Sequence, residues 1–350
     1  MSRGPWDRRW ACGIALVCCL IIALGCPLLP AAEADQAGDS AQARSTDSEK
    51  AAAKPQAGDK ASSDQPDSEK EKPKHPPLDK VTKDLTPITG GLLTLYQGDD
   101  KLLAEIKPSD LNQDFIVLIT IARGIGQTPV LGGFSWNFGD DWVWQFRKSG
   151  NRIHVVRRNV RFSADADSPS ERAVRLAFTD SILYSLPILT RGEGGSYVVD
   201  LGDVFLSDLP QISLALPGFS FSRPRSTWAD VKAYSKNVEV QVAATYASSG
   251  AMEIDTVPDS RGVTVGVHYS ISRLPQTNYQ PRLADDRVGY FLSVKKDYSK
   301  ADQDDRFVRY ITRWNLQKAD PNAEKSPPKE PIIFYLEKTI PYKYRKPIRD

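Results

Sequence analysis

The chain has 350 residues, and 46 lysines and arginines against 44 aspartates and glutamates leave a net charge of +2. A charge this close to zero gives no support for a nucleic-acid-binding protein or for electrostatic attachment to an anionic membrane. All four cysteines lie within the first 26 residues. The rest of the chain therefore cannot contain a disulfide framework, a cysteine-ligated zinc, an iron–sulfur cluster or a cysteine nucleophile.

The first 34 residues have the pattern of a signal peptide. Three arginines precede an apolar stretch over residues 11–29, and small residues at Ala32 and Ala34 fit a cleavage site. Two alternatives stay open: an uncleaved membrane anchor, because the apolar stretch is close to spanning length, and lipidation at Cys26. All three place the body of the protein outside the cytoplasm, in the periplasm or secreted.

Residues 35–85 have the composition of a disordered linker. They mix Ala, Ser, Gln, Pro and both charges with almost no large apolar side chain. Such a segment cannot bury enough surface to offset the entropy lost on ordering. The alternation of Lys with Asp and Glu is typical of a solvated tether, so we expect the folded part to begin near residue 86.

From there on, short runs rich in β-branched and aromatic residues alternate with turn residues, and helical periodicity is scarce. The pattern predicts a mainly β fold, with an antiparallel, sandwich-like body over residues 86–320 and a few short helices. Strands are expected at residues 92–96, 115–121, 142–146, 153–156, 174–178, 197–200, 238–245, 263–272, 288–294 and 332–336. Short helices are expected at residues 181–189, 203–209 and 227–234.

The body offers few residues for catalysis or metal binding. His154 and His268 lie on expected strands far apart in the sequence, and the chain has neither the spacing of a zinc motif nor that of a serine triad. Ser270 shares a strand face with His268, which we interpret as a coincidence. We therefore expect no catalytic residue, no metal ligand and no cofactor in this chain.

Aromatic residues are dense over residues 134–146. Trp136, Trp142 and Trp144 predict either a platform that stacks on a glycan or peptide, or a part of the hydrophobic core. We favour the core, because Trp142, Trp144 and Phe146 share one strand face. The platform remains the basis of an alternative function, a stand-alone extracytoplasmic module that binds glycans or peptides.

A charged turn precedes the strand expected at residues 288–294. The motif consists of Arg282, Asp285, Asp286, Arg287, Gly289 and Tyr290. Buried ion pairs would lock this turn, whereas exposed pairs would contribute little to stability.

The stretch over residues 281–291, PRLADDRVGYF, resembles large secreted bacterial zinc metalloproteases of the metzincin type, within their N-terminal domain of unknown function. Further blocks that carry the resemblance lie at residues 139–146, 157–162, 181–188, 331–336 and 341–350. The resemblance implies that residues 331–350 begin the protease domain, whose zinc motif HExxHxxGxxH follows later in that family.

The sequence reaches Asp350 without such a motif, so no zinc ligand and no general base of the family can be assigned to a residue here. The resemblance implies a non-catalytic accessory region that supports folding, shields the active cleft or helps to bind substrate. Its expected partner is a protease domain encoded downstream, or a peptide or protein substrate. Zinc is expected only in that missing domain, and we expect this truncated chain to be inactive alone.

Overall fold

A computed structural model of the chain describes residues 75–136, 142–249, 252–299 and 305–350. The expected signal peptide, Cys26 and the linker up to residue 74 lie outside the described residues. The described part begins inside the expected linker, where residues form α2 (Leu78–Thr82). Leu78, Val81 and Leu85 are half-buried at helical spacing, so apolar side chains order this short stretch. It was not expected from the sequence, because the residues before it have the composition of a disordered linker.

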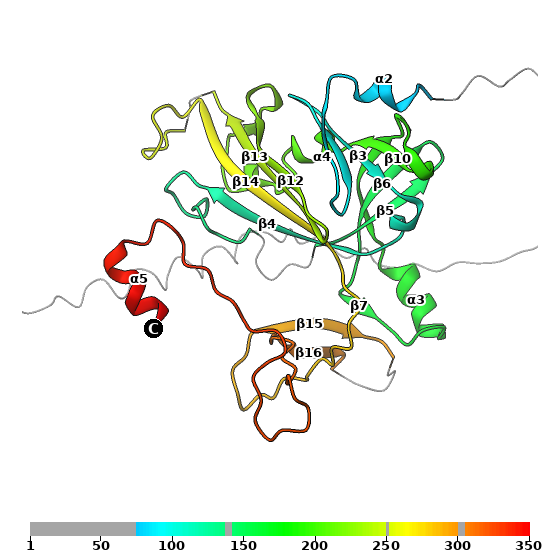
Figure 1. The fold of residues 1–350 in the computed structure, drawn as a ribbon, viewed down its shortest axis with the longest axis vertical. Helices are drawn as coiled ribbons and strands as arrows, with labels where there is room; N and C mark the ends of the chain where they lie inside the picture. The colour runs from blue at the N-terminus through cyan, green and yellow to red at the C-terminus, as the bar shows by residue number, and fades with distance from the viewer. Residues whose placement is uncertain (1–74, 137–141, 250–251, 300–304) are drawn as a thin grey trace, which may run out of the picture. The chain divides into compact units, whose positions relative to one another are not determined.

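Antiparallel strands form two of the three sheets in the described residues (Figure 1). The five-stranded sheet has the order β1 (Thr86–Ile88), β2 (Thr94–Gln97), β3 (Leu102–Ile106), β10 (Tyr197–Asp200), β9 (Thr190–Arg191). The eight-stranded sheet has the order β11 (Ser220–Phe221), β13 (Asn237–Ala247), β14 (Gly262–Arg273), β4 (Phe115–Arg123), β5 (Val143–Ser149), β6 (Arg152–Arg157), β8 (Ser181–Pro187), and β12 (Thr227–Ala233) pairs with β13.

The third sheet has the order β16 (Phe307–Ile311), β15 (Leu292–Asp297), β7 (Phe162–Ser163). Its β15 pairs with β16 in the antiparallel sense and with β7 in the parallel sense. This pairing joins the C-terminal part of the chain to the segment that follows β6. The mainly β fold with a few short helices is confirmed.

Side chains from the five-stranded and eight-stranded sheets meet in one hydrophobic core. Along β13, Val238, Val240 and Val242 are fully buried while the residues between them are half-buried, which is the period-two pattern of a strand with one face on the core. The core continues through α4 (Gly202–Phe205), whose Phe205 ring stacks on Trp144 at a centroid distance of 6.4 Å.

The two longest helices among the described residues are α3 (Pro169–Ala177) and α5 (Tyr342–Arg349). No helix among the described residues is long and apolar enough to span a lipid bilayer.

Several expected elements are wrong. Residues 181–189 and 227–234 were expected to be helical but form β8 and β12, because each pairs along its length with a neighbouring strand. The strand expected at residues 174–178 falls on α3 and the residue after it. Residues 332–336 form no strand, since they have no pairing partner among the described residues.

Candidate functional site

The three candidate tryptophans do not form an open platform. Trp142 and Trp144 have exposed fractions of 8% and 1% and belong to the hydrophobic core. The guanidinium of Arg157 lies over the Trp142 ring, 4.3 Å from its centroid. Trp136 is half-buried, and its Nε1 donates a hydrogen bond to the carbonyl of Pro210 at 2.7 Å. Rings held in this way pack the sheets together and leave no row of open faces for a ligand.

The charged turn lies at the surface. Arg287 Nη2 is 2.6 Å from Asp285 Oδ2, but the two side chains are 87% and 46% exposed, so they form no buried lock. Hydrogen bonds from the Arg287 side chain and backbone hold the pKa of Asp285 down to about 2. A backbone hydrogen bond attaches the turn to β16 instead, since Ile311 N donates to the carbonyl of Arg282 at 2.9 Å.

The end of the motif lies elsewhere than expected. Gly289 and Tyr290 were expected inside a strand, but β15 begins at Leu292, and both residues precede it without a strand partner among the described residues. Asp286 is exposed in the turn itself. The structure therefore brings these residues together as a surface turn.

His268 lies on the outer face of the eight-stranded sheet. Its Nε2 is 2.8 Å from Glu239 Oε2, and its Nδ1 is 3.4 Å from Thr120 Oγ1. Ser270 also donates to Glu239, at 2.8 Å, so His268 and Ser270 contact the same carboxylate rather than each other. These contacts join three adjacent strands, β4, β13 and β14, across the sheet face. Among the described residues, no group of three or more His, Cys, Asp or Glu side chains could hold a metal ion.

A pocket with two lobes lies beside β6, the segment after it, α3 and the start of β8. The larger lobe has a volume of about 630 Å³ and the smaller about 310 Å³, and they share Arg158, Asn159, Phe162 and Thr179 in their walls. We call the two lobes together the arginine pocket. The arginines that line it are Arg147, Arg157, Arg158, Arg161 and Arg175.

A chain of hydrogen bonds holds one wall of the arginine pocket in place. Arg158 Nη1 and Gln145 Nε2 both donate to the Asp114 carboxylate, at 2.9 and 2.7 Å, and Arg147 Nε donates to Gln145 Oε1 at 2.9 Å. Arg147 Nη2 and the backbone N–H of Asn159 both donate to the Asp180 carboxylate, at 2.6 and 2.8 Å. Because Asn159 follows Arg158 in the sequence, the chain closes on itself. Such a closed network fixes the positions of these side chains.

The hydrogen bonds of this network also lower the pKa of Asp180. Burial by itself raises the pKa of the carboxyl, but the hydrogen bonds from Asn159 and Arg147 outweigh burial, so the pKa lies below its ordinary value. Asp180 is therefore a carboxylate at neutral pH and keeps Arg147 in place.

Aromatic rings form the other side of the larger lobe. Phe162 and Phe178 stack in parallel, with centroids 3.8 Å apart and an interplanar angle of 4°. Tyr298, which follows β15, lies 5.8 Å from Phe178. The pocket thus combines an apolar wall with guanidinium groups.

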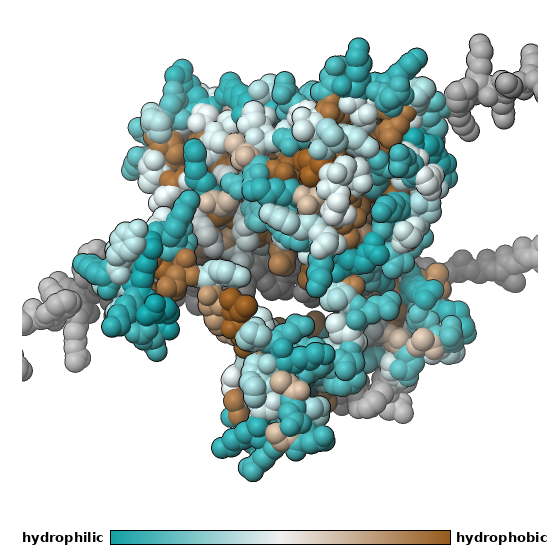
Figure 2. All heavy atoms as spheres, in the orientation of Figure 1, coloured by the Kyte–Doolittle hydropathy of each residue, from teal (hydrophilic) through white to brown (hydrophobic). Residues whose placement is uncertain are grey.

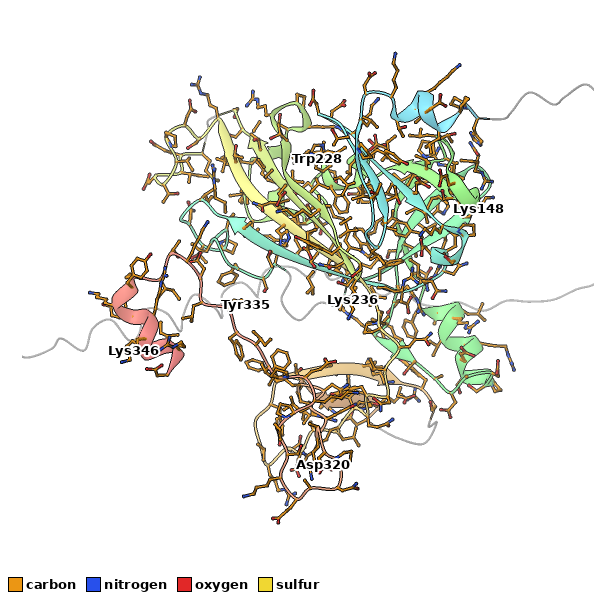
Figure 3. The ribbon with its side chains drawn as sticks, viewed as in Figure 1. Lys148, Trp228, Lys236, Asp320, Tyr335 and Lys346 are labelled. Atoms are coloured by element: carbon orange, nitrogen blue, oxygen red, sulfur yellow. The ribbon has the colours of Figure 1, made fainter. Side chains whose placement is uncertain are left out.

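A second feature is the exposure of large apolar side chains towards the C-terminus. After β14, Ile311 is the one large apolar side chain in the buried core of the described residues. The exposed ones include Leu283, Val288, Trp314, Leu316, Ile333, Phe334, Tyr335, Leu336, Tyr342, Tyr344 and Ile348, which we call the C-terminal apolar surface. Figure 2 shows hydrophobic side chains at the surface along the segment before α5, where Figure 3 labels Tyr335.

Residues 137–319 match the family described as domain of unknown function DUF5117. This match covers more than half of the chain. The chain belongs to the DUF5117 family. No curated protein and no solved structure matches it.

The DUF5117 region contains all the described residues that line the arginine pocket and the charged turn, while the last part of the C-terminal apolar surface follows it. Sequence reasoning missed the pocket. The signal was present in the run RRNVRF at residues 157–162, but Asp114 and Asp180, which position Arg158 and Arg147, come from distant strands and loops.

Proposed function

We propose that this DUF5117 chain is a non-catalytic region of an exported zinc-dependent, metalloprotease-like protein, and that it supports or shields a catalytic domain outside these residues. The ordered blocks of resemblance to metzincin-type proteases support a zinc-dependent protease domain as that catalytic domain. The C-terminal apolar surface is the observation that carries the docking role.

Exposure on this scale is unusual for the surface of a folded protein. Ile333, Phe334 and Tyr335 have exposed fractions of 63%, 80% and 90% and follow one another in the chain. Large apolar patches that remain open to solvent mark sites of interaction, because covering them releases free energy at roughly 25 cal/mol per Å². A protein partner that covers this segment would therefore gain from apolar burial.

The backbone of this segment points to the same conclusion. Residues 332–336 have the composition of a buried strand, yet their backbone groups make no hydrogen bond to another described residue. An unpaired extended segment can add to the edge of a partner's sheet, where main-chain hydrogen bonds give affinity and alternate side chains fill pockets. A continuous apolar run suits a strand that is covered on both faces.

Site-specific cross-linking tests the proposal. A photo-reactive phenylalanine analogue would replace Phe334 in the full chain, expressed in its native cells. We expect a cross-link to a folded domain that carries a His-Glu-x-x-His motif and binds zinc, whether that domain is on the same polypeptide or on another.

The matched control places the analogue at Leu176 on α3, whose side chain is 90% exposed but lies outside the C-terminal apolar surface. An equal yield at both positions, or cross-links only to a second copy of this chain, would overturn the proposal. The protein alone should show no chelator-sensitive proteolysis, and such activity would contradict the non-catalytic role.

A further inference from the structure

A further pocket lies between Pro76 and Pro77 on one side and the residues that follow β5 and β8 on the other. Its volume is about 610 Å³, and we call it the proline pocket. Thr190 in β9 is almost fully buried, and its hydroxyl donates a hydrogen bond to the carbonyl of Pro76. This hydrogen bond attaches the proline wall to the five-stranded sheet, so the pocket is part of the folded body.

Two cations line the proline pocket, Lys148 and Arg191. Arg191 lies opposite Tyr197 in the pairing of β9 with β10, and its guanidinium is 4.0 Å from the centroid of the Tyr197 ring. Lys148, labelled in Figure 3, places its Nζ 5.9 Å from the same centroid. Because both cations lie over one ring, their charges are held close together.

No carboxylate balances these two charges within the described structure. The described lining of the pocket contains neither aspartate nor glutamate, and Glu193, two residues after Arg191, is outside it. Lys148 Nζ donates to the carbonyl of Gly150 at 2.9 Å and Arg191 Nη1 to the carbonyl of Gly195 at 3.1 Å. Neither side chain forms an ion pair with a described residue. Two like charges held in this way repel each other, so an anion beside them is attracted to both.

Both cations are exposed to solvent and keep donors for a ligand. An ammonium group has three N–H donors and a guanidinium five, and each side chain uses one of them for the carbonyl that it contacts. Asn151 also lines the pocket and is exposed, and its side-chain amide adds two further donors. The pocket therefore has several N–H donors that a ligand arriving from solvent can reach.

The proline pocket also has an apolar part. Ile188 is 4% exposed and belongs to the hydrophobic core, and Pro76 and Pro77 contribute two rings to the wall. A concave site lined by apolar groups and a few polar ones is typical of pockets for small molecules. This combination suits a ligand that has a negative charge at one end and an apolar body at the other.

We propose that the proline pocket binds a small organic anion. The carboxylate or phosphate group of the ligand contacts Lys148 and Arg191, and its apolar body lies against Ile188 and the prolines. This site is independent of the docking role proposed above, because its residues lie outside the C-terminal apolar surface and it needs no catalytic domain.

Calorimetric titration of the full chain tests the site with three probes that share a phenyl ring: phenylacetate, phenyl phosphate and phenylacetamide. The first two are anions, and the third is neutral. We expect at least one anion to bind, with an affinity that falls as salt is raised, and phenylacetamide to bind about tenfold or more weakly. Binding of phenylacetate alone would identify a carboxylate ligand, binding of phenyl phosphate alone a phosphate ligand, and binding of both an anion site that accepts either group.

Asn151→Asp provides the decisive variant, because it replaces an exposed amide with a carboxylate of the same size. The hydrogen bond from Ile188 N to the carbonyl of Asn151, at 3.0 Å, involves only the backbone and is kept. The new charge should compete with the ligand for Lys148 and Arg191 and weaken anion binding by about tenfold or more. The matched control is Asn278→Asp, exposed and outside the pocket, which should bind within about threefold of the wild type.

Arg191→Gln removes one of the two cations and should also weaken anion binding, whereas Arg191→Lys keeps the charge and should retain most of it. Circular dichroism checks that each variant is folded. The proposal is overturned if neither anion binds at millimolar concentration or if phenylacetamide binds as well as the anions. It is also overturned if Asn151→Asp or Arg191→Gln binds like the wild type, or if Asn278→Asp binds as weakly as Asn151→Asp.

Discussion

Asp180 connects the start of β8 to two other elements. Its Oδ1 accepts a hydrogen bond from the backbone N–H of Asn159, and its Oδ2 pairs with Arg147 on β5. Both side chains of this ion pair are partly exposed, so its contribution is smaller than that of a fully buried pair. The backbone hydrogen bond adds to the contribution of the ion pair, because a half-buried N–H group without an acceptor would lower the free energy of unfolding.

We expect Asp180→Asn to lower the free energy of unfolding by about 1 kcal/mol at neutral pH. The pKa of Asp180 is lower in the folded chain than its ordinary value of 3.8. Its charged form therefore stabilises the fold above that value, and the contribution is lost as the pH falls through the folded-state pKa. Urea denaturation across a pH series should show the difference from wild type shrinking in acid.

The control for this comparison is Asp203→Asn, which removes a more exposed pair with Arg223. A constant difference between wild type and Asp180→Asn at every pH would contradict the assignment to the carboxylate.

Arg287→Ala should leave the melting temperature unchanged, because its pair with Asp285 is exposed to solvent. The pKa of Asp285 should rise from about 2 towards its ordinary range when the hydrogen bonds of Arg287 are lost. Thermal unfolding and an NMR titration of the Asp285 carboxyl measure the two effects. A large fall in melting temperature would restore the locking role.

At the scale of elements, α3 shows how a local signal determines structure. Ser168 Oγ accepts a hydrogen bond from the backbone N–H of Glu171 at 3.0 Å, and Pro169 occupies the first turn. Both features favour the start of a helix. No α3 side chain is buried, so the helix depends more on its cap than on packing.

Ser168→Ala should destabilise α3 locally by about 1 kcal/mol, the usual effect of losing an N-cap side chain. Hydrogen–deuterium exchange of the α3 amides should become faster, while β13 and β14 stay protected. Leu176→Ala is the control, since that side chain is 90% exposed and alanine favours helix. Equal exchange in Ser168→Ala and wild type would exclude the capping role.

The sequence predicts the long strands best. The alternation of residues 238–245 and 263–272 is strong because one face of β13 and β14 lies on the core, and both strands form where they were expected. The sequence pattern does not predict β8, because the burial of its residues does not alternate cleanly and its apolar residues fit a helix equally well. It also fails for β3, which was not expected and is buried along its whole length.

The whole chain divides its apolar residues unevenly. Up to β14 they form one continuous core, whereas afterwards they are mostly exposed. This division follows from tertiary pairing, which a pattern of residues alone does not contain. The arginine pocket has the same origin: its arginines are visible in the sequence, but the closed network that positions them needs Asp114, Gln145 and Asp180 from separate elements.

The combined variant Ile333→Ser, Phe334→Ser, Tyr335→Ser tests this division. Because the three side chains make no core contacts, the melting temperature should stay within about 2 °C of the wild type, which corresponds to a change well under 1 kcal/mol. Binding of a hydrophobic dye and self-association on gel filtration should both decrease. A clear fall in melting temperature would show that these residues pack against the body.

The parallel pairing of β15 with β7 has a mechanical consequence. Lys296 N donates to the carbonyl of Arg161 at 2.7 Å, and Tyr298 N donates to the carbonyl of Ser163 at 2.8 Å, on either side of Phe162. A force on the C-terminal strands would therefore be transmitted through these two hydrogen bonds to the backbone of Arg161. A partner that binds the C-terminal part of the chain would therefore act on the position of Arg161 in the arginine pocket, which lies about 130 residues earlier in the sequence.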